Sequence, residues 1–268
     1  MDKKLNVLIT GSSSGIGKAV CDYFLSQGHC VFGIDVKNAD KSEGLTHFSA
    51  SVTDESALLE VKQELSKRDI TLDVVLNIAG IHKMASLVEN DYNEMKKVID
   101  VNLCGCMLVC KTFHSLLAKS GRVVIVTSEV AGLDPMPFNG LYNVSKTALD
   151  CYAQALRQEL NLLGQKVVVI RPGAVSTPLC DGSLTATQTL SDTTTLYKRQ
   201  AKHFLSITKK FMGKPMSATT LAKLVYKAST KRHPKLIYNK HRNVGLVLLG
   251  KLPKRTQCWI IKKLLNRK

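Results

Sequence analysis

Thr10-Gly11-Ser12-Ser13-Ser14-Gly15-Ile16-Gly17 is the stretch that decides the fold. It follows an apolar run over residues 5–9, which predicts a buried strand, and it precedes apolar residues at helical spacing over 18–25. The glycines therefore lie in a tight strand-to-helix turn, where they allow a sharp bend and a close approach of the backbone to a pyrophosphate. An ordinary glycine-rich turn is the alternative. The cofactor-binding residues predicted in this turn are Gly11, Ser13, Ser14, Gly15, Ile16 and Gly17.

Asp35 ends the next predicted strand, 30–35, and follows Gly17 by about 18 residues, close to the typical spacing of ~20. A carboxylate at this point accepts hydrogen bonds from the adenosine ribose hydroxyls and repels a 2′-phosphate. Ser14 in the turn carries no positive charge that could hold a 2′-phosphate. The pattern favours NAD, and the neighbouring Lys37 keeps NADP as the alternative. The alternative is that Asp35 binds no cofactor and is only a solvated residue at the end of a strand.

Strands and helices alternate along the chain, which predicts an α/β fold with right-handed crossovers. We expect a Rossmann-type doubly wound parallel sheet of about seven strands with helices on both faces. Residues 1–238 would form one NAD(P)-binding catalytic domain, with a substrate segment at about 175–230, and 239–268 would form a basic C-terminal extension. The further predicted strands are 46–52, 73–77, 122–128, 166–171 and 236–238, and the further predicted helices are 55–67, 92–117, 141–163, 196–208 and 218–229.

Residues 175–195 interrupt this alternation with small and polar side chains. They follow the carboxyl end of the sixth predicted strand, the edge at which ligands bind in such sheets. We predict a mobile substrate lid here, with a plain surface loop as the alternative.

The net charge of +17 is unevenly distributed, because residues 193–268 hold 20 of the 38 Lys and Arg residues and none of the 21 Asp and Glu residues. The back of the chain is therefore suited to an anionic partner. The start of the chain leads directly into the first strand and no apolar run approaches ~20 residues, so we expect neither a signal peptide nor a membrane span. The eight cysteines lack metal-binding spacing, which favours reduced thiols in a cytoplasmic protein without a metal.

Four polar side chains are predicted to converge at the edge of the sheet that carries the glycine turn. Tyr142 and Lys146 are four residues apart and so share one face of a helix. Ser128 ends the fifth predicted strand, and Asn102 lies in the helix before that strand. A phenol, an ammonium, a hydroxyl and an amide thus come from three consecutive elements.

With these residues in order, residues 5–178 resemble the short-chain dehydrogenase/reductase family. The matching motifs are the Thr10–Gly17 turn, Asn77-x-Ala79-Gly80, Asn102, Ser128, Tyr142-x-x-x-Lys146 and Pro172-Gly173-x-x-x-Thr177. The resemblance implies hydride transfer between a nicotinamide and an alcohol or carbonyl carbon, in a homodimer or homotetramer. It also implies that the remaining cofactor-binding residues are Asp35, Ser51, Val52, Asn77, Ala79, Gly80, Pro172, Gly173 and Thr177. Ser51 stands where the family usually has an aspartate.

The resemblance also assigns catalytic roles. Tyr142 would be the general acid/base, and Lys146 together with the oxidised nicotinamide would lower its pKa and favour the phenolate. Ser128 would hold the substrate oxygen, and Asn102 would hold a water that links Lys146 to solvent.

Two neighbouring residues, Ser128 and Glu129, are candidates for the position at which the family has its catalytic serine. Counting back from Tyr142 by the usual family spacing reaches Glu129, so either the loop has one extra residue or a carboxylate occupies the position. We favour the extra residue, because an ionised carboxylate beside a forming alkoxide would raise the barrier, whereas a hydroxyl lowers it.

The expected activity is that of an NAD-dependent alcohol dehydrogenase or ketoreductase. Apolar residues around the lid suggest a lipid-, steroid- or retinoid-like substrate; they are Leu179, Leu184, Leu190, Phe204 and Phe211. The alternative is a non-catalytic NAD(P)-binding sensor or scaffold, against which the complete set of catalytic residues argues. Nucleic-acid binding is not expected, because the basic segment has few aromatic residues for stacking.

The last eleven residues read as a basic amphipathic helix. Cys258, Ile261, Leu264 and Leu265 fall at helical spacing, Trp259 and Ile260 widen the apolar side, and Lys262, Lys263 and Arg267 lie largely opposite. This is the pattern of a helix that lies in a membrane interface. We expect reversible association with an anionic membrane through residues 240–268. The alternative is that the helix caps the substrate pocket and its charges are merely solvated.

Overall fold

Seven parallel strands form the central sheet of the computed structural model, which describes residues 3–211 and 214–267 apart from the side chains of Asp181, Lys210 and Phe211. The strand order is β3-β2-β1-β4-β5-β6-β9. This arrangement confirms the predicted doubly wound sheet. The strands of this sheet are β1 (Asn6–Thr10), β2 (Cys30–Asp35), β3 (Leu45–Ser49), β4 (Leu72–Asn77), β5 (Leu117–Val126), β6 (Lys166–Pro172) and β9 (Ile237–Lys240), and a separate short pair is formed by β7 (Val175–Ser176) and β8 (Met216–Ser217).

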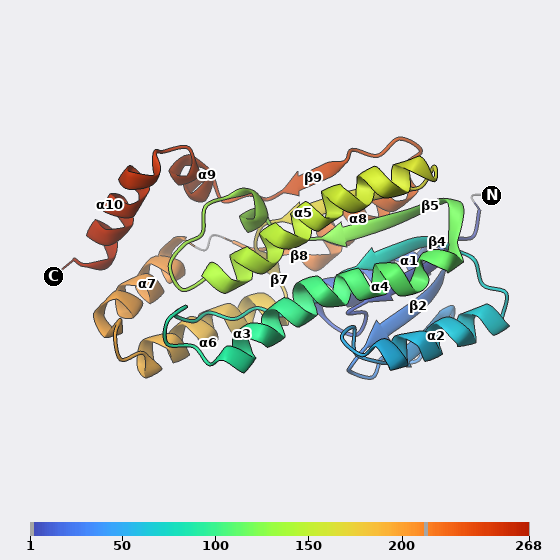
Figure 1. Cartoon of the computed structure of the whole chain (residues 1–268), viewed down its shortest axis with the longest axis horizontal. Helices are drawn as coiled ribbons and strands as arrows, with labels where there is room; N and C mark the ends of the chain where they lie inside the picture. Colours follow the sequence, from blue (N-terminus) through green and yellow to red (C-terminus); the bar gives the residue numbers. More distant parts are fainter. Residues whose placement is uncertain (1–2, 212–213, 268) are drawn as a thin grey trace.

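The helices cover both faces of the sheet and its carboxyl end (Figure 1). One face carries α2, α4 and α5, and the other carries α1 and α8. The helices α6, α7, α9 and α10 lie together beyond the carboxyl ends of the strands (Figure 1). The helices are α1 (Gly15–Ser26), α2 (Glu55–Lys67), α3 (Tyr92–Ile99), α4 (Gly105–Phe113), α5 (Gly140–Leu162), α6 (Pro178–Thr193), α7 (Lys198–Phe211), α8 (Ala218–Thr230), α9 (Val244–Gly250) and α10 (Lys254–Leu265).

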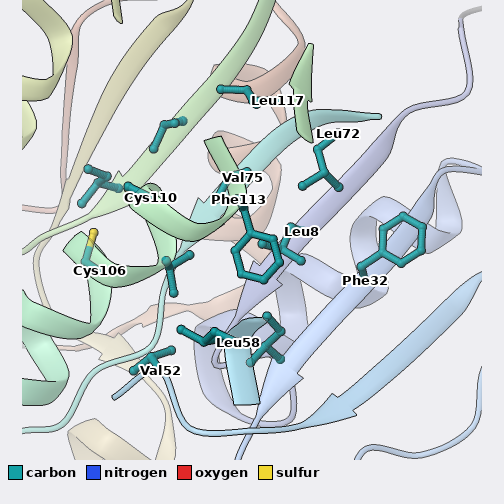
Figure 2. Packing of buried hydrophobic residues seen from close by; sticks show 14 of the residues in the cluster. Leu8, Phe32, Val52, Leu58, Leu72, Val75, Cys106, Cys110, Phe113 and Leu117 are labelled. Carbon is teal, nitrogen blue, oxygen red and sulfur yellow. The ribbon is translucent and has the colours of Figure 1, made fainter. Parts of the chain in front are cut away.

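The strand β1 shows how the sequence supplies both core layers. Successive side chains of a strand point to opposite faces of the sheet. Leu8 accordingly belongs to the core under α2, α4 and α5, whereas Val7 and Ile9 belong to the core under α1 and α8. Figure 2 shows Phe113 of α4 beside Leu8 in the first of these layers. Because β1 is buried on both faces, its three middle residues Val7, Leu8 and Ile9 are all apolar, with no polar residue alternating among them.

The strand order reverses between β1 and β4, which creates a crevice at their carboxyl ends. Thr10 ends β1 and is paired in register with Asn77, which ends β4. The Thr10 hydroxyl accepts hydrogen bonds from the N–H groups of Ile78 (3.1 Å) and Ala79 (3.2 Å). The glycine turn after β1 and the turn after β4 are thereby held together at the position where doubly wound sheets bind ligands.

The long helix predicted over 92–117 is divided in the structure. A π-helical turn, η1 (Asp100–Cys104), separates α3 from α4, and α4 ends at Phe113. The predicted last residue, Leu117, instead opens β5 and pairs with Leu72 of β4. The prediction failed there because the apolar residues of a buried helix and of a buried strand look alike over a short run.

The segment 175–195 is not irregular, as the sequence suggested, because it contains the short strand β7 and the whole of α6. Thr177 caps the helix, since its hydroxyl accepts a hydrogen bond from the Cys180 N–H (3.3 Å), and Pro178 opens the first turn. Within the helix, the hydroxyl of Thr187 donates to the Ser183 carbonyl (2.7 Å), and that of Thr189 to the Thr185 carbonyl (3.0 Å). These bonds satisfy the small polar side chains that made the segment resemble a loop.

The C-terminal residues form two helices, α9 and α10. Only α10 was predicted to be helical. Its buried face is made by Gln257, Ile261 and Leu265, and Cys258 is exposed, contrary to the predicted apolar face. Gln257 is accommodated because its amide donates to the Asp134 carboxylate (2.8 Å) and the Leu252 carbonyl (2.7 Å). Ile261 and Leu265 pack in one apolar cluster with Phe204 of α7.

Candidate active site

Two adjoining cavities lie at the carboxyl edge of the sheet. The first, of about 610 Å³, runs from the glycine turn past Asp35, and the second, of about 320 Å³, contains Tyr142. Residues common to both are Ile16, Ile78, Gly80, Thr177 and Leu179. We name them the dinucleotide cavity and the substrate cavity.

Most of the predicted site residues line one of these cavities. Those in the dinucleotide cavity are Gly11, Ser14, Gly15, Ile16, Gly17, Asp35, Ser51, Val52, Ala79, Gly80 and Thr177. Those in the substrate cavity are Ile16, Gly80, Ser128, Tyr142, Lys146, Pro172, Gly173 and Thr177. Among the described residues, Ser13, Asn77 and Asn102 line neither.

The glycine turn has the geometry that a dinucleotide requires. Gly11 has φ of +71°, which favours glycine, and a Cβ on Gly17 would lie 1.8 Å from the Gly11 carbonyl oxygen. The side chain of Ser14, the residue that precedes α1, makes no hydrogen bond to the helix, and the first turn contains no acidic residue. The N–H groups at the start of α1 are therefore available to phosphate oxygens, and the residues present fit a bound dinucleotide.

Asp35 is fixed at the other end of the dinucleotide cavity. One carboxylate oxygen accepts the Ser13 N–H (3.0 Å), and the other accepts the Lys37 N–H (2.9 Å). The Ser13 hydroxyl donates to the Lys37 carbonyl (2.9 Å), so Ser13 supports Asp35 rather than lining the cavity. Each carboxylate oxygen has further lone pairs, which ribose hydroxyls can use.

Tyr142, Ser128 and Lys146 come together in the substrate cavity. The side chains of Ser128 and Tyr142 are hydrogen-bonded, and the Lys146 ammonium lies 5.8 Å from the centre of the Tyr142 ring. Lys146 also donates to the Val126 carbonyl at the end of β5 (3.4 Å). Consecutive elements, β5 and α5, thus deliver a hydroxyl, a phenol and an ammonium to one point.

Burial controls the charges of this group. It raises the pKa of Tyr142 to about 12, although the hydrogen bond from Ser128 acts in the opposite direction. Burial also lowers the pKa of Lys146 to about 8. In the protein alone burial is the larger of these two effects on the Tyr142 pKa. The lowering of that pKa by Lys146 together with the oxidised nicotinamide stays a prediction.

Glu129 also lines the substrate cavity, and its carboxylate is held by the C-terminal part of the chain. It opens a short 3₁₀ turn, η3 (Glu129–Gly132), and one carboxylate oxygen accepts the Asn243 N–H just before α9 (2.5 Å). Burial raises the pKa of Glu129, while the Asn243 N–H and the nearby Arg242 and His241 lower it. The hydroxyl that meets Tyr142 therefore belongs to Ser128, which is the arrangement expected from one extra residue in the loop.

Asn102 lies in the π-helical turn η1 and is fully buried. Its carbonyl oxygen accepts the Ile81 N–H (2.8 Å), and its amide donates to the Ile81 carbonyl (2.9 Å) and the Ser145 hydroxyl (3.0 Å). These bonds position the loop after Gly80 beside Lys146. The amide hydrogens are thus already paired, and a water relay through this side chain stays a prediction.

His82 is a site residue that the sequence reasoning missed. Its ring stands edge-on to Tyr142 with centroids 4.6 Å apart, and its nitrogens contact the Asn139 side-chain oxygen (2.9 Å) and the Ser183 hydroxyl (3.1 Å). Burial lowers the pKa of His82, although the hydrogen bond to Asn139 acts in the opposite direction. The one available signal was its place two residues after Gly80.

The rest of the substrate cavity combines apolar walls with polar lining residues, among them His82, Glu129, Asn139, Ser183, Thr208 and Asn243. Leu179 and Phe204 line it as predicted, and Met84, Met136, Ile207 and Leu246 complete its walls. In the described part of the chain, Leu184 and Leu190 do not line the cavity, and the side chain of Phe211 lies outside the described residues. Leu190 packs instead in the cluster that holds Phe204.

Comparisons with known proteins agree with this geometry. A family model described as short chain dehydrogenase matches residues 5–187. The NADPH-dependent 1-acyldihydroxyacetone phosphate reductase of Schizosaccharomyces pombe is 37% identical over 186 residues, which make up 67% of this chain and 62% of that protein. The 3-ketodihydrosphingosine reductase of Bacteroides thetaiotaomicron is 28% identical over 176 residues, 65% of each chain. The chain thus spans less than two thirds of the length of these curated relatives.

A solved structure shows the same fold. A short chain dehydrogenase family protein from Francisella tularensis superposes with a TM-score of 0.74 at 22% identity, over 88% of this chain and 97% of that one. The family model covers more than half of the chain and includes the glycine turn, Tyr142 and Lys146. The chain belongs to the short-chain dehydrogenase/reductase family of oxidoreductases that bind NAD(P).

Proposed function

We propose that the protein transfers a hydride between NAD(H) and the alcohol or carbonyl carbon of an apolar substrate. The observation that carries the proposal is the junction of the two cavities. The dinucleotide cavity begins at the glycine turn, and the substrate cavity that adjoins it holds the Ser128–Tyr142–Lys146 group. A nicotinamide at the junction would lie beside the phenol that exchanges a proton with the substrate.

The protein side chains divide the chemistry among them. When bound, NAD supplies the hydride acceptor and a positive charge. Ser128 donates a hydrogen bond to the substrate oxygen, and Tyr142 removes the proton during alcohol oxidation or supplies it during carbonyl reduction. Lys146 has a lowered pKa and can pass protons to and from Tyr142. Asn102 holds the loop that places Gly80 against Lys146, where a Gly80 Cβ would lie 3.3 Å from the ammonium.

The choice of NAD rests on Asp35. A 2′-phosphate would meet its carboxylate, which two backbone N–H groups hold in place at the end of the cavity. The relative from Schizosaccharomyces pombe is named as NADPH-dependent, so NADP is the competing cofactor.

The substrate cavity supports an apolar substrate with one polar end. Leucine, isoleucine, methionine and phenylalanine side chains form much of its walls. Ser128 and Tyr142 supply the polar groups at the reacting end, and further polar residues, among them His82, Asn139 and Asn243, also line the cavity. The names of the two relatives describe lipid-related reductases, and a lipid-like ketone or alcohol fits the same lining. Steroid- and retinoid-like alcohols belong to the same class. Assembly as a homodimer or homotetramer stays a prediction of the family resemblance.

A panel of apolar secondary alcohols with NAD, followed through NADH absorbance, tests the proposal. We expect turnover of at least one member and loss of that turnover in Tyr142→Phe, which keeps the ring but removes the acid/base. NAD binding by calorimetry should be retained in this variant. If the wild type binds NAD and turns over no alcohol or ketone of the panel, a non-catalytic sensor replaces the enzyme.

A further inference from the structure

The helix α9 has two faces with different surroundings. Leu246 faces the substrate cavity, together with Asn243 just before the helix. Val244 and Leu248 are two positions away from Leu246 on either side, which places them on the opposite side of a helix. They are 69% and 58% exposed. The outer face of α9 is therefore apolar and open to solvent.

The helix α10 is arranged in the same way. Its inner residues Ile261 and Leu265 pack with Phe204, so these two of the apolar residues that the sequence assigned to a membrane are covered by protein. Trp259 lies on the opposite side and is 59% exposed. The Lys263 ammonium lies 4.8 Å from the centre of its ring. The exposed Trp259 is thus next to a cation. The helix α10, which carries both residues, lies at one end of the molecule (Figure 1).

The charge of this end is almost uncompensated by the protein. No acidic residue follows Asp192 in the chain. Among the described residues after that point, only Lys254 forms a salt bridge, to Asp134. Arg255, Lys262 and Lys263 are exposed on the same side of α10 as Trp259. Such a surface attracts anions, and its aromatic and aliphatic side chains suit the boundary between lipid headgroups and acyl chains.

We propose that this surface docks on a bilayer that contains anionic lipid. The docking face consists of Val244, Leu248, Arg255, Trp259, Lys262 and Lys263. Association is peripheral, since no helix in residues 3–211 or 214–267 is long and apolar enough to cross a bilayer. Exposed apolar residues favour lipid over a nucleic acid, because a phosphate backbone offers them no apolar partner. The proposal concerns binding by the folded protein and does not depend on its catalytic activity.

The inner faces of the two helices explain why docking would leave the fold intact. Leu246, Ile261 and Leu265 keep their contacts with the protein, and only side chains that are already exposed enter the interface. The same helix that offers Val244 and Leu248 to lipid lines the substrate cavity through Leu246. The docking face and one wall of the cavity are thus two sides of α9.

Trp259 is the single tryptophan of the chain, so intrinsic fluorescence reports on this face alone. The full-length protein is titrated with phosphatidylcholine vesicles that contain or lack phosphatidylglycerol. We expect a blue shift of the emission and quenching by brominated lipid with the anionic vesicles, with reversal at high salt. Neutral vesicles should give weaker binding by about tenfold or more.

Paired charge reversals give the matched control. Lys262→Glu with Lys263→Glu should weaken vesicle binding by about tenfold or more. Lys67→Glu with Lys119→Glu makes the same change in net charge on exposed residues near the amino ends of the strands, and should leave binding within about threefold. Both variants are checked for wild-type thermal unfolding, which exposed positions should retain.

Four outcomes overturn the proposal. The first is no vesicle binding at low salt. The second is binding without a change in Trp259 emission, which would place the contact on another basic surface. The third is equal loss in the two charge-reversal variants, which would indicate a response to net charge alone. Emission shifts with duplex DNA and none with vesicles would identify a nucleic acid as the partner and also overturn it.

Discussion

Replacing Ser128 with alanine removes the hydroxyl that we assign to the substrate oxygen. Loss of one such donor typically costs about a hundredfold or more in kcat, which corresponds to about 2.7 kcal/mol of transition-state stabilisation. A second effect follows from the structure, because the Ser128 hydrogen bond lowers the pKa of Tyr142. Without it that pKa rises further. Alcohol oxidation needs the phenolate, so the rise of kcat/KM with pH should move to higher pH.

Glu129→Gln is the matched control for that substitution. The carboxamide oxygen of the glutamine can still accept the Asn243 N–H, so we expect less than about a tenfold loss. Both variants are assayed for kcat and KM across pH by NADH absorbance, and for NAD affinity by calorimetry, which should not change. A larger loss in Glu129→Gln than in Ser128→Ala, or an unmoved pH profile in Ser128→Ala, would refute the assignment of Ser128.

Three further substitutions test separate parts of the site. Wild-type protein should bind NAD about tenfold or more tighter than NADP, a difference of about 1.4 kcal/mol in binding free energy. Asp35→Asn should remove most of this preference, because the 2′-phosphate no longer meets a carboxylate. Calorimetry with both cofactors tests this, and an unchanged ratio of the two affinities would contradict us. Gly17→Ala should abolish NAD binding, since its Cβ would lie 1.8 Å from the Gly11 carbonyl oxygen. The control is Gly182→Ala on the exposed side of α6, where a Cβ meets free space; it should be neutral or stabilising by up to about 1 kcal/mol in thermal unfolding. Equal behaviour of the two variants would contradict the turn geometry. The cofactor-free wild type should gain stability between pH 8 and 10.5, because the pKa of Lys146 is about 8 in the folded protein and the unfolded chain binds more protons in that window. Urea unfolding should show that Lys146→Met loses this gain. If the stabilities of wild type and Lys146→Met change with pH in parallel, Lys146 is not desolvated.

The local signals of the sheet could be read from the sequence. Val7, Leu8 and Ile9 in the middle of β1 are apolar because the strand is buried on both faces, and Gly11 and Gly17 are required by the backbone itself. Asp35 and Tyr142 could be placed because parallel strands bring their carboxyl ends to one edge. Where the chemistry follows from position along the sheet, the sequence was sufficient.

Features that depend on packing between distant segments could not be predicted. The buried face of α10 includes Gln257 because Asp134, far away in the chain, accepts its amide hydrogen. His82 enters the site only because Asn139 and Ser183 meet it from other elements. The pKa of Tyr142 depends on burial by the whole cavity, which no local spacing reveals. Glu129 could be separated from Ser128 only when Asn243 was seen to hold it.

Deuteride tracing tests the central claim most directly. NADH carrying deuterium at the nicotinamide C4 is incubated with a panel of apolar ketones, and the alcohols are examined by mass spectrometry. The account predicts one deuterium at the carbinol carbon of at least one product with wild-type protein and none with Tyr142→Phe. Tight NADH binding with no labelled alcohol from any ketone, or undiminished labelling in Tyr142→Phe, would contradict it.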